Sequence, residues 1–203
     1  GMIKMVKVIK EGVVYKKGAG LTPSTLDAQS IDAARKKTIA YPILSSHSVC
    51  EGDDLKIKFD AMASHDITYV GIIQTARASG LREFPIPYAM TNCHNSLCAV
   101  GGTINEDDHV FGLSAAKKYG GIYVPANQSV IHSYAREELA KCGGMILGSD
   151  SHTPTGGGIG MIAIGAGGLD VAVAMGGGEY HITMPKMTRI NLSGKLPPYV
   201  SAK

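Results

Sequence analysis

A short polar loop in the last third of the chain carries the residues best suited to chemistry. Asp150, Ser151 and His152 place a carboxylate, a hydroxyl and an imidazole in succession, two residues after the apolar run 145–147. That run is typical of a buried strand, so the three groups are expected just past a strand's end. The glycine run 156–158 follows, where backbone can approach a ligand without an intervening Cβ. The pattern indicates a site, and an ordinary glycine-rich turn is the alternative.

The three polar groups cannot form a nucleophilic triad among themselves, because neighbouring side chains point apart. A hydrolase that used Ser151 would take its base and orienting acid from other segments, and no Gly-x-Ser-x-Gly turn surrounds this serine. An imidazole from a neighbouring loop is a more natural partner for Asp150, and His132 is the obvious candidate. Such a pair fixes the tautomer of the ring and keeps it available for proton transfer. Hydrolysis through Ser151 is the minor alternative.

Other cofactor patterns are weak. Cys93, His94 and Cys98 give a Cys-x4-Cys spacing with one histidine, which lacks the four-ligand rhythm of structural zinc. We therefore expect no metal site in this chain. The loop 155–160 lacks the Lys-Ser/Thr of a P-loop and the Gly-x-Gly-x-x-Gly of a dinucleotide fold. Three further histidines are expected to be surface or packing residues: His65, His109 and His181.

The elements that would position these groups alternate between strand and helix. Strands are expected at 85–90, 122–124 and 145–147, separated by helices over about 107–119 and 128–141. Short connections between such elements predict parallel strands with right-handed crossovers, hence a three-layer α/β/α fold with a mainly parallel sheet.

Parallel strands end at one edge of their sheet, where α/β proteins bind ligands. The polar clusters 92–96, 127–132 and 149–152 all follow expected strand ends. One crevice is therefore expected to collect all three.

Further elements are expected on both sides of this unit. Before it we expect a hairpin of 6–9 with 13–15, a helix over 30–40 that ends before Pro42, a strand at 55–59, and a helix over about 65–79 capped by Ser64, with Ile67 among its apolar residues. After the glycines we expect a buried helix over 169–175 and strands at 180–184 and 188–192.

Composition sets limits on the class of protein. The chain has 203 residues, of which 44% are hydrophobic and 18% charged, as expected for a globular domain with a real core. Residues 1–40 hold eight Lys/Arg against three acids, so the net charge of +3 conceals a basic N-terminal segment. Its basic runs lack aromatic residues for base stacking, so a solvated surface is expected instead of nucleic-acid binding. We predict a weakly defined basic segment over 1–54 and an α/β/α domain over 55–203.

The cellular setting follows from weaker signals. The run 159–178 contains Asp170 and many glycines, so a membrane helix is not expected there. The N-terminus lacks the apolar core of a signal peptide, and the four cysteines are scattered. A reducing cytoplasm with free thiols is therefore expected.

The loop 148–160, Gly-Ser-Asp-Ser-His-Thr-Pro-Thr-Gly-Gly-Gly-Ile-Gly, resembles the signature of the aconitase/3-isopropylmalate dehydratase superfamily. Its surroundings agree, because 130–132 resembles the family's helix-start histidine and 162–170 the segment after the signature. Residues 185–196 resemble the next strand pair, and Asp-Ala-Met-Ala at 60–63 resembles the start of an early family helix. The resemblance covers about residues 55–200, the N-terminal portion of the family, and within it uncharacterised aconitase-like hydratases look most similar.

The resemblance implies a hydro-lyase that adds or removes water on a hydroxy-di- or tricarboxylate, using a 4Fe-4S iron–sulfur cluster. It implies that His132 and Asp150 form a hydrogen-bonded pair and that His94 protonates the leaving hydroxyl. His152 is then the fourth catalytic residue. The implied substrate-binding residues are Ser151, Asn95 and Ser64.

Two departures from the family limit this reading. Cys93 stands where the family has an aspartate, so His94 would lose its orienting acid, and Ser64 replaces a longer glutamine. The cluster-ligating cysteines and the arginines that grip substrate carboxylates lie far downstream in the family. We therefore predict an N-terminal fragment of an aconitase-like hydro-lyase that is inactive and cluster-free by itself. The alternative is a short non-enzymatic protein whose crevice holds a carboxylate, a phosphate or a metal ion.

Overall fold

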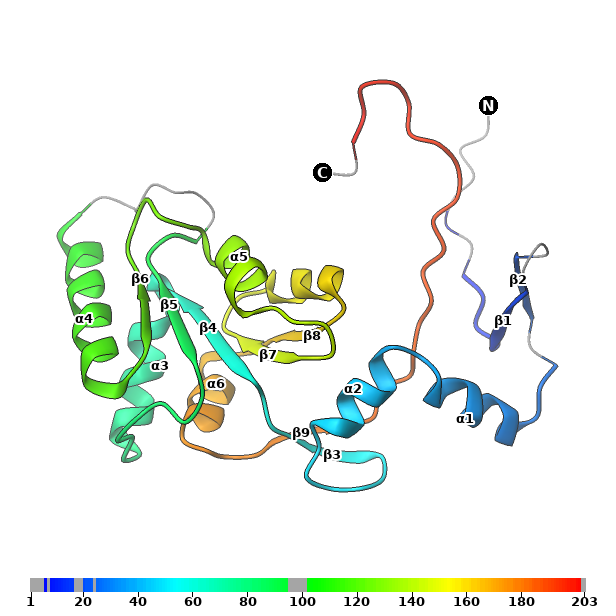
Figure 1. Cartoon of the computed structure of the whole chain (residues 1–203), viewed down its shortest axis with the longest axis horizontal. Coiled ribbons are helices and arrows are strands. Elements are labelled where there is room, and N and C mark those ends of the chain that lie inside the picture. The colour runs from blue at the N-terminus through cyan, green and yellow to red at the C-terminus, as the bar shows by residue number, and fades with distance from the viewer. Residues whose placement is uncertain (1–5, 7, 17–19, 24, 95–101, 202–203) are drawn as a thin grey trace.

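A five-stranded parallel sheet forms the centre of the computed structural model, which describes residues 6, 8–16, 20–23, 25–94 and 102–201 (Figure 1). The strand order is β6-β5-β4-β7-β8, and every neighbouring pair is parallel. The strands are β4 (Ala61–His65), β5 (Tyr88–Thr91), β6 (Ile122–Val124), β7 (Met145–Gly148) and β8 (Ile162–Gly165). The mainly parallel α/β sheet expected from the sequence is confirmed.

Helices cover both faces of this sheet and complete three layers. On one face α3 (Asp66–Ala78) packs against both α4 (Thr103–Tyr119) and α6 (Gly168–Met175). On the other face lie α5 (Ile131–Tyr134), the π-helical turn Ala135–Leu139 that continues it, and the 3₁₀ turn Thr153–Ile159. Figure 1 shows α5 on the opposite side of the sheet from α3 and α6.

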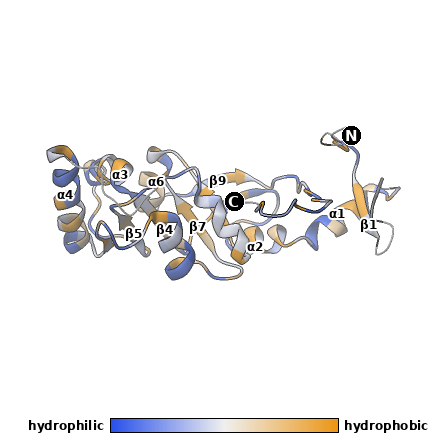
Figure 2. Cartoon of the chain, turned by 90° about the horizontal axis from the view of Figure 1, so that it is seen from above, coloured by the Kyte–Doolittle hydropathy of each residue, from blue (hydrophilic) through white to orange (hydrophobic). Residues whose placement is uncertain are grey.

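The sheet separates the hydrophobic core into clusters on its two faces, because alternate residues of each strand point to opposite faces. Met62, Tyr88 and Leu147 belong to the large cluster that includes the buried side chains of α3 and α6. Ala63 packs on the other face with Ile131 of α5. Because side chains alternate along a strand, His65 falls on the same face of β4 as Ala63. Figure 2 shows the hydrophobic β7 within the body of the molecule.

The segment 60–65 corrects one expectation. Residues 60–63 were expected at the start of a helix, and they form most of β4, the central strand. All five residues of β4 are buried, as is typical of a parallel strand covered on both faces. Helix α3 therefore begins only at Asp66, and Ser64 is not its cap: His65 occupies that position without a side-chain cap hydrogen bond. Ile67 lies on the exposed side of α3.

Other boundaries also differ from expectation. The strand at 55–59 is β3 (Asp54–Ile57), which pairs with β9 (Tyr180–Thr183) in a separate antiparallel sheet. Strand β8 was not anticipated, and 188–192 is not a strand. The helix expected over 128–141 is shortened to α5 and its π-helical turn, since Ala140 already has extended backbone.

The N-terminal segment forms different pairs from those expected. The hairpin joins β1 (Val13–Lys16) to β2 (Gly20–Pro23), and the described residues 6, 8 and 9 take no part in it. Two helices follow, α1 (Ala28–Lys36) and α2 (Ala40–Ser46). Pro42 lies in the first turn of α2, where a missing backbone N–H costs little.

The described N- and C-terminal segments extend to one side of the sheet domain (Figure 1). The Arg189 guanidinium of the C-terminal segment lies 4.6 Å from the ring centroid of Tyr15 in β1. Among the described helices, none has the length and apolar character needed to span a membrane. The domain boundary at residue 54 stays a prediction.

Candidate functional site

The carboxyl ends of three neighbouring strands supply the site. His65 ends β4, His94 follows β5, and the loop with Asp150 follows β7. The fourth contributor, α5, is anchored nearby because the backbone N–H of Ile131 donates to the Cys93 carbonyl at 3.0 Å. That bond brings the next residue, His132, beside His94: their ring centroids are 5.9 Å apart.

Asp150 is the centre of the cluster, and its side chain is only 4% exposed. Its Oδ2 is 2.5 Å from His94 Nε2, and its Oδ1 accepts the His152 backbone N–H at 2.7 Å. His132 Nε2 and His152 Nδ1 lie 3.5 Å and 3.4 Å from Oδ1. The four residues expected to be catalytic, His94, His132, Asp150 and His152, are thus brought together.

Within this group the pairing differs from the expected one. The resemblance implied a hydrogen bond between His132 and Asp150, yet His132 Nε2 is buried without a hydrogen-bond partner in the described part of the chain. The short contact of Asp150 goes to His94. His94 therefore does have an acid beside it, although Cys93 replaces the neighbouring aspartate of the family. Cys93 itself is buried and its Sγ accepts the Asn127 backbone N–H at 3.4 Å.

The loop that carries Asp150 is folded back tightly. The Thr153 backbone N–H and hydroxyl both donate to the Asp150 carbonyl, at 3.2 Å and 2.7 Å. A Cβ at Gly148 would lie 2.3 Å from Thr153 Oγ1, and one at Gly165 only 2.4 Å from the Asp150 carbonyl oxygen. By contrast, a Cβ at Gly157 would meet nothing within 4 Å. The glycines that the site requires are therefore Gly148 and Gly165, which flank the loop in space.

His65 is a member of the site that the sequence analysis missed. Its ring stacks on that of His94, with centroids 4.0 Å apart and planes 13° from parallel. Its Nε2 is 3.6 Å from Asp150 Oδ2, and its Nδ1 is 3.8 Å from Asp66 Oδ1. Asp66 in turn pairs with His109 Nε2 at 3.1 Å. Histidines and carboxylates thus alternate from His109 to His94. The sequence signal for His65 was the His65-Asp66 pair at the end of a buried strand. That signal becomes visible only when 61–65 is recognised as a strand.

Burial and hydrogen bonding act in opposite directions on the Asp150 carboxyl. Burial raises its pKa, but the His152 backbone N–H, the hydrogen bond from His94 and the charge of nearby imidazoles lower it, and the net shift is downward. Burial lowers the pKa of His132, against the attraction of Asp150, and the other imidazoles lower it further. The site therefore favours an ionised carboxylate beside a neutral His132.

The expected substrate-binding residues have different positions. Ser151 is exposed, and its Oγ is 3.2 Å from His152 Nδ1. Ser64 is fully buried within β4, and strand alternation places its side chain on the opposite face from His65, away from the cluster. Asn95 lies outside the described residues.

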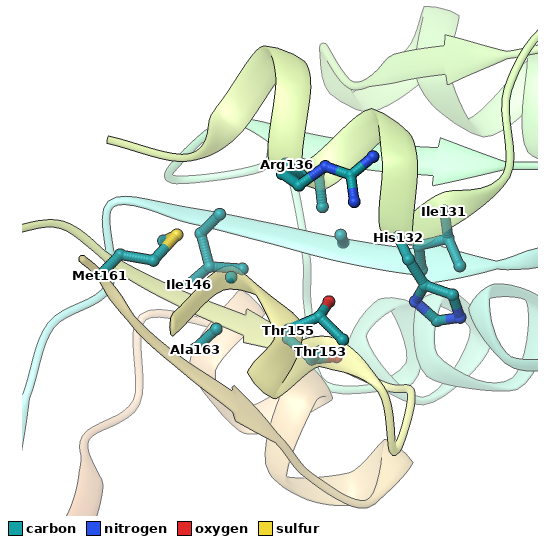
Figure 3. Close-up of a pocket in the computed structure, with 11 residues that line it drawn as sticks. Ile131, His132, Arg136, Ile146, Thr153, Thr155, Met161 and Ala163 are labelled. Carbon is teal, nitrogen blue, oxygen red and sulfur yellow. The ribbon is translucent and has the colours of Figure 1, made fainter. Parts of the chain in front are cut away.

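A pocket beside His132 is bounded by α5, the 3₁₀ turn and β7 (Figure 3). Ile131, Ile146, Thr153 and Met161 are among its lining residues, and its volume is ≈ 20 Å³. That space suffices for about one water molecule, so a di- or tricarboxylic acid does not fit inside. The partly exposed rings of His94 and His152 therefore mark the accessible side of the cluster.

The described cysteines do not suit an iron–sulfur cluster. Cys93 lies at the carboxyl edge of the sheet, Cys142 precedes β7 at the amino edge, and Cys50 lies near β3. Cys98 is outside the described residues. Cysteine thiolates are the usual ligands of 4Fe-4S clusters, and the groups of metal-ligating side chains found in the described part of the chain contain only His and Asp. The three described cysteines therefore do not form a cluster site.

Comparison with known proteins agrees with the signature. The Aconitase family (aconitate hydratase) matches residues 40–203. The mitochondrial aconitate hydratase of Saccharomyces cerevisiae is 30% identical over 198 residues, covering 87% of this chain and 25% of that protein. An aconitase–ribosomal protein bL21m fusion protein of Schizosaccharomyces pombe is 32% identical over 192 residues, covering 83% and 21%.

A third relative has a different printed activity. The mitochondrial homocitrate dehydratase of Saccharomyces cerevisiae is 30% identical over 190 residues, covering 82% of this chain and 24% of that protein. The chain thus spans only about a fifth to a quarter of the length of these relatives. The match over residues 40–203, with the signature loop built around Asp150, shows that the chain belongs to the aconitase family.

Proposed function

We propose that this chain is the portion of an aconitase-like hydro-lyase that handles protons while water is added to or removed from a hydroxy-di- or tricarboxylate. The observation that supports this most is the buried Asp150 carboxylate beside His94, at the sheet edge formed by the family's signature loop. Addition of water to a carbon–carbon double bond, and the reverse elimination, both require proton transfer at carbon and at oxygen. A carboxylate–imidazole pair in a buried setting supplies that.

The residues divide into two groups under this proposal. His94 is the proton carrier: its Nε2 faces Asp150, which orients the ring and balances its charge. The stacked ring of His65, whose Nδ1 lies 3.8 Å from Asp66 Oδ1, restricts His94 further and acts as a positioning residue. His132 stays neutral because burial lowers its pKa. Ser151 and His152 are exposed beside the cluster and would contact substrate, as would Asn95.

The rest of the active site would come from outside this chain. As the family resemblance implies, a 4Fe-4S cluster held by downstream cysteines would supply a Lewis acid for the substrate hydroxyl and carboxylate, and downstream arginines would hold the remaining carboxylates. The described cysteines offer no cluster site. The 203-residue chain alone is therefore expected to be inactive and to lack iron–sulfur absorbance. The two Saccharomyces cerevisiae relatives above are named as mitochondrial proteins, and the cytoplasmic location expected from the sequence stays a prediction.

A chimera tests the proposal. This chain would replace the matching quarter of the Saccharomyces cerevisiae mitochondrial aconitate hydratase, and hydration of aconitate and of the homocitrate-derived alkene would be measured after cluster loading. We expect hydration of at least one tricarboxylate, and no turnover by the 203-residue chain alone. A folded, cluster-loaded chimera that binds these acids but hydrates neither would overturn the proposal, provided that the unmodified yeast enzyme is active under the same conditions.

A further inference from the structure

His132 Nε2 is a buried nitrogen that remains unpaired among the described residues because the close contact of Asp150 is with His94. It has no hydrogen-bond partner in the described part of the chain, and such atoms are rare in folded proteins. The nearest carboxylate oxygen, Asp150 Oδ1, is 3.5 Å away. His152 Nδ1 lies 3.4 Å from the same oxygen. Two imidazole nitrogens and one carboxylate oxygen thus converge without bonding closely to one another.

The distances from Asp150 Oδ1 to the two imidazole nitrogens match those between ligand atoms around one small cation. Tetrahedral Zn²⁺ binds His N and Asp O at about 2.0–2.2 Å, which places its ligand atoms about 3.3–3.5 Å apart. The ligand atoms of His132, Asp150 and His152 all lie within 4.8 Å of one another. We propose that His132 Nε2, Asp150 Oδ1 and His152 Nδ1 bind one divalent transition-metal ion such as Zn²⁺.

The ring orientations favour this trio over the other candidate group, His65, His94 and Asp150. A ring nitrogen directs its lone pair within the ring plane, so two imidazoles can share an ion only where their planes intersect near it. The rings of His132 and His152 are inclined by 45° with centroids 5.1 Å apart. The rings of His65 and His94 are stacked within 13° of parallel, so their lone pairs run side by side. His94 Nε2 is also bonded closely to Asp150 Oδ2.

Access and charge suit such an ion. The His152 side chain is 63% exposed, so an ion can arrive from solvent. The buried Asp150 supplies a negative charge, and its Oδ1 accepts one backbone N–H, which leaves a second lone pair for the metal. Three protein ligands leave the fourth position of a tetrahedral ion open to water or a carboxylate. The site needs neither the iron–sulfur cluster nor the downstream portion of the family, so it goes beyond the proposed hydration, with which it shares Asp150 and His152.

The test uses the purified 203-residue chain under reducing conditions. Zn²⁺ binding would be followed by calorimetry, and Co²⁺ binding by visible absorption, which reports tetrahedral coordination. We expect one equivalent to bind. His132→Gln, Asp150→Asn and His152→Gln should each weaken binding by at least about 100-fold, the upper end of what losing a supporting group of a metal site costs.

Matched controls separate the trio from its neighbours. His65→Gln removes a histidine of the same cluster, and His181→Gln removes a surface histidine that pairs with Glu179; both should keep the affinity of the parent chain. Circular dichroism and Tm check that each variant is folded. His152→Gln changes an exposed side chain on a loop, so this variant is expected to fold like the parent chain.

Three results would overturn the proposal. The first is an absence of binding below millimolar metal by the folded parent chain. The second is binding that survives His152→Gln but is lost in His65→Gln, which would assign the ion to the other group. The third is a thiolate-to-cobalt charge-transfer band, which would assign it to cysteine. None of these depends on whether the chimera hydrates a tricarboxylate.

Discussion

Asp60 precedes β4 at the amino end of the sheet and Asp150 follows β7 at the carboxyl end, so an aspartate–histidine pair lies at each end. Asp60 Oδ2 accepts from His47 Nε2 at 3.0 Å and from the Met145 backbone N–H at 2.8 Å. Lys141 Nζ is 3.3 Å from Oδ1. For both aspartates burial raises the pKa, and hydrogen bonds and cationic neighbours outweigh it and lower the pKa overall.

The two pairs differ in what their histidines do next. The other nitrogen of His47, Nδ1, lies 2.8 Å from the Ile43 carbonyl, so both of its nitrogens have partners. Around Asp150 there are four imidazoles for one carboxylate, and His132 Nε2 is left without a partner among the described residues. A satisfied pair ties segments together. Where several imidazoles surround one carboxylate, a ring nitrogen remains available to bind a ligand or a proton. That difference, more than residue type, distinguishes a functional site from a structural pair.

Replacing Asp150 should give the largest effect. In the chimera, Asp150→Asn leaves His94 without its carboxylate, and we expect hydration to fall by about 10²–10⁴-fold, the usual contribution of a proton-transfer group. Asp60→Asn is the matched control, because it makes the same change at the other end of the sheet and should retain most of the rate per folded molecule. Steady-state hydration rates measure both. Equal losses in the two variants would contradict the distinction between the ends.

Gly165 and Gly144 test how rigid each end is. A Cβ at Gly165 would lie 2.4 Å from the Asp150 backbone carbonyl, whereas one at Gly144 would chiefly meet the flexible Lys141 side chain. We expect Gly165→Ala to lower the free energy of unfolding by about 3 kcal/mol, the upper end of overpacking costs. Gly144→Ala should cost clearly less. Urea denaturation of the 203-residue chain compares them, and a larger loss in Gly144→Ala would show that the Asp60 end is the more rigid.

Asp60→Ala tests the structural role of the amino-end pair. The change removes the acceptor for the Met145 backbone N–H and for His47. We expect a loss of about 1–2 kcal/mol in the free energy of unfolding, as for a partly buried group deprived of its partner. The acid sensitivity should change too. A depressed carboxyl pKa adds stability above 3.8 that is lost as pH falls through the folded pKa, so the variant should lose less stability on acidification. If the free energy of unfolding of the variant fell with acidification as steeply as that of the parent chain, this role would be contradicted.

The pKa of His132 gives the smallest and most local test. Burial lowers that pKa below 6.5. Between the folded pKa and 6.5 the unfolded chain binds the extra proton, so this residue makes stability rise with pH across that interval. Asp150 raises the His132 pKa, and Asp150→Asn should lower it further. Proton NMR titration of the ring measures both. A His132 pKa above 6.5 would indicate an ion pair between His132 and Asp150. His132 Nε2 would then have a partner, which contradicts the unpaired nitrogen described above.

Much of the fold followed from local pattern. Short apolar runs at 85–90, 122–124 and 145–147, separated by helical segments, sufficed to predict parallel strands that end at one edge. The loop with Asp150 was recognisable because charged and polar residues directly after a buried strand have few other uses. The basic first 40 residues and the family signature were equally visible, since each depends on residue identity alone.

The central strand was the main failure. Ala-Met-Ala-Ser-His at 61–65 lacks the β-branched residues that mark most strands, and it is a strand because β5 and β7 supply hydrogen bonds on both sides. That error displaced Ser64 to a helix cap and left His65 among the packing residues. The edge strand β8 escaped notice for a similar reason, because its glycine-rich surroundings show no strand pattern.

Sequence by itself therefore determined the family, the alternation of strands and helices, and the loop on which Asp150 lies. Tertiary structure alone decided which imidazole takes the carboxylate. His65, His94, His132 and His152 come from four segments, and 2.5 Å at His94 against 3.5 Å at His132 is settled by strand register, ring stacking and the anchoring of α5 to Cys93. Differences of one ångström decide whether a nitrogen is bonded or vacant, because hydrogen bonds weaken steeply beyond about 3.2 Å. Such distances depend on contacts between residues far apart in the chain, which no local pattern records.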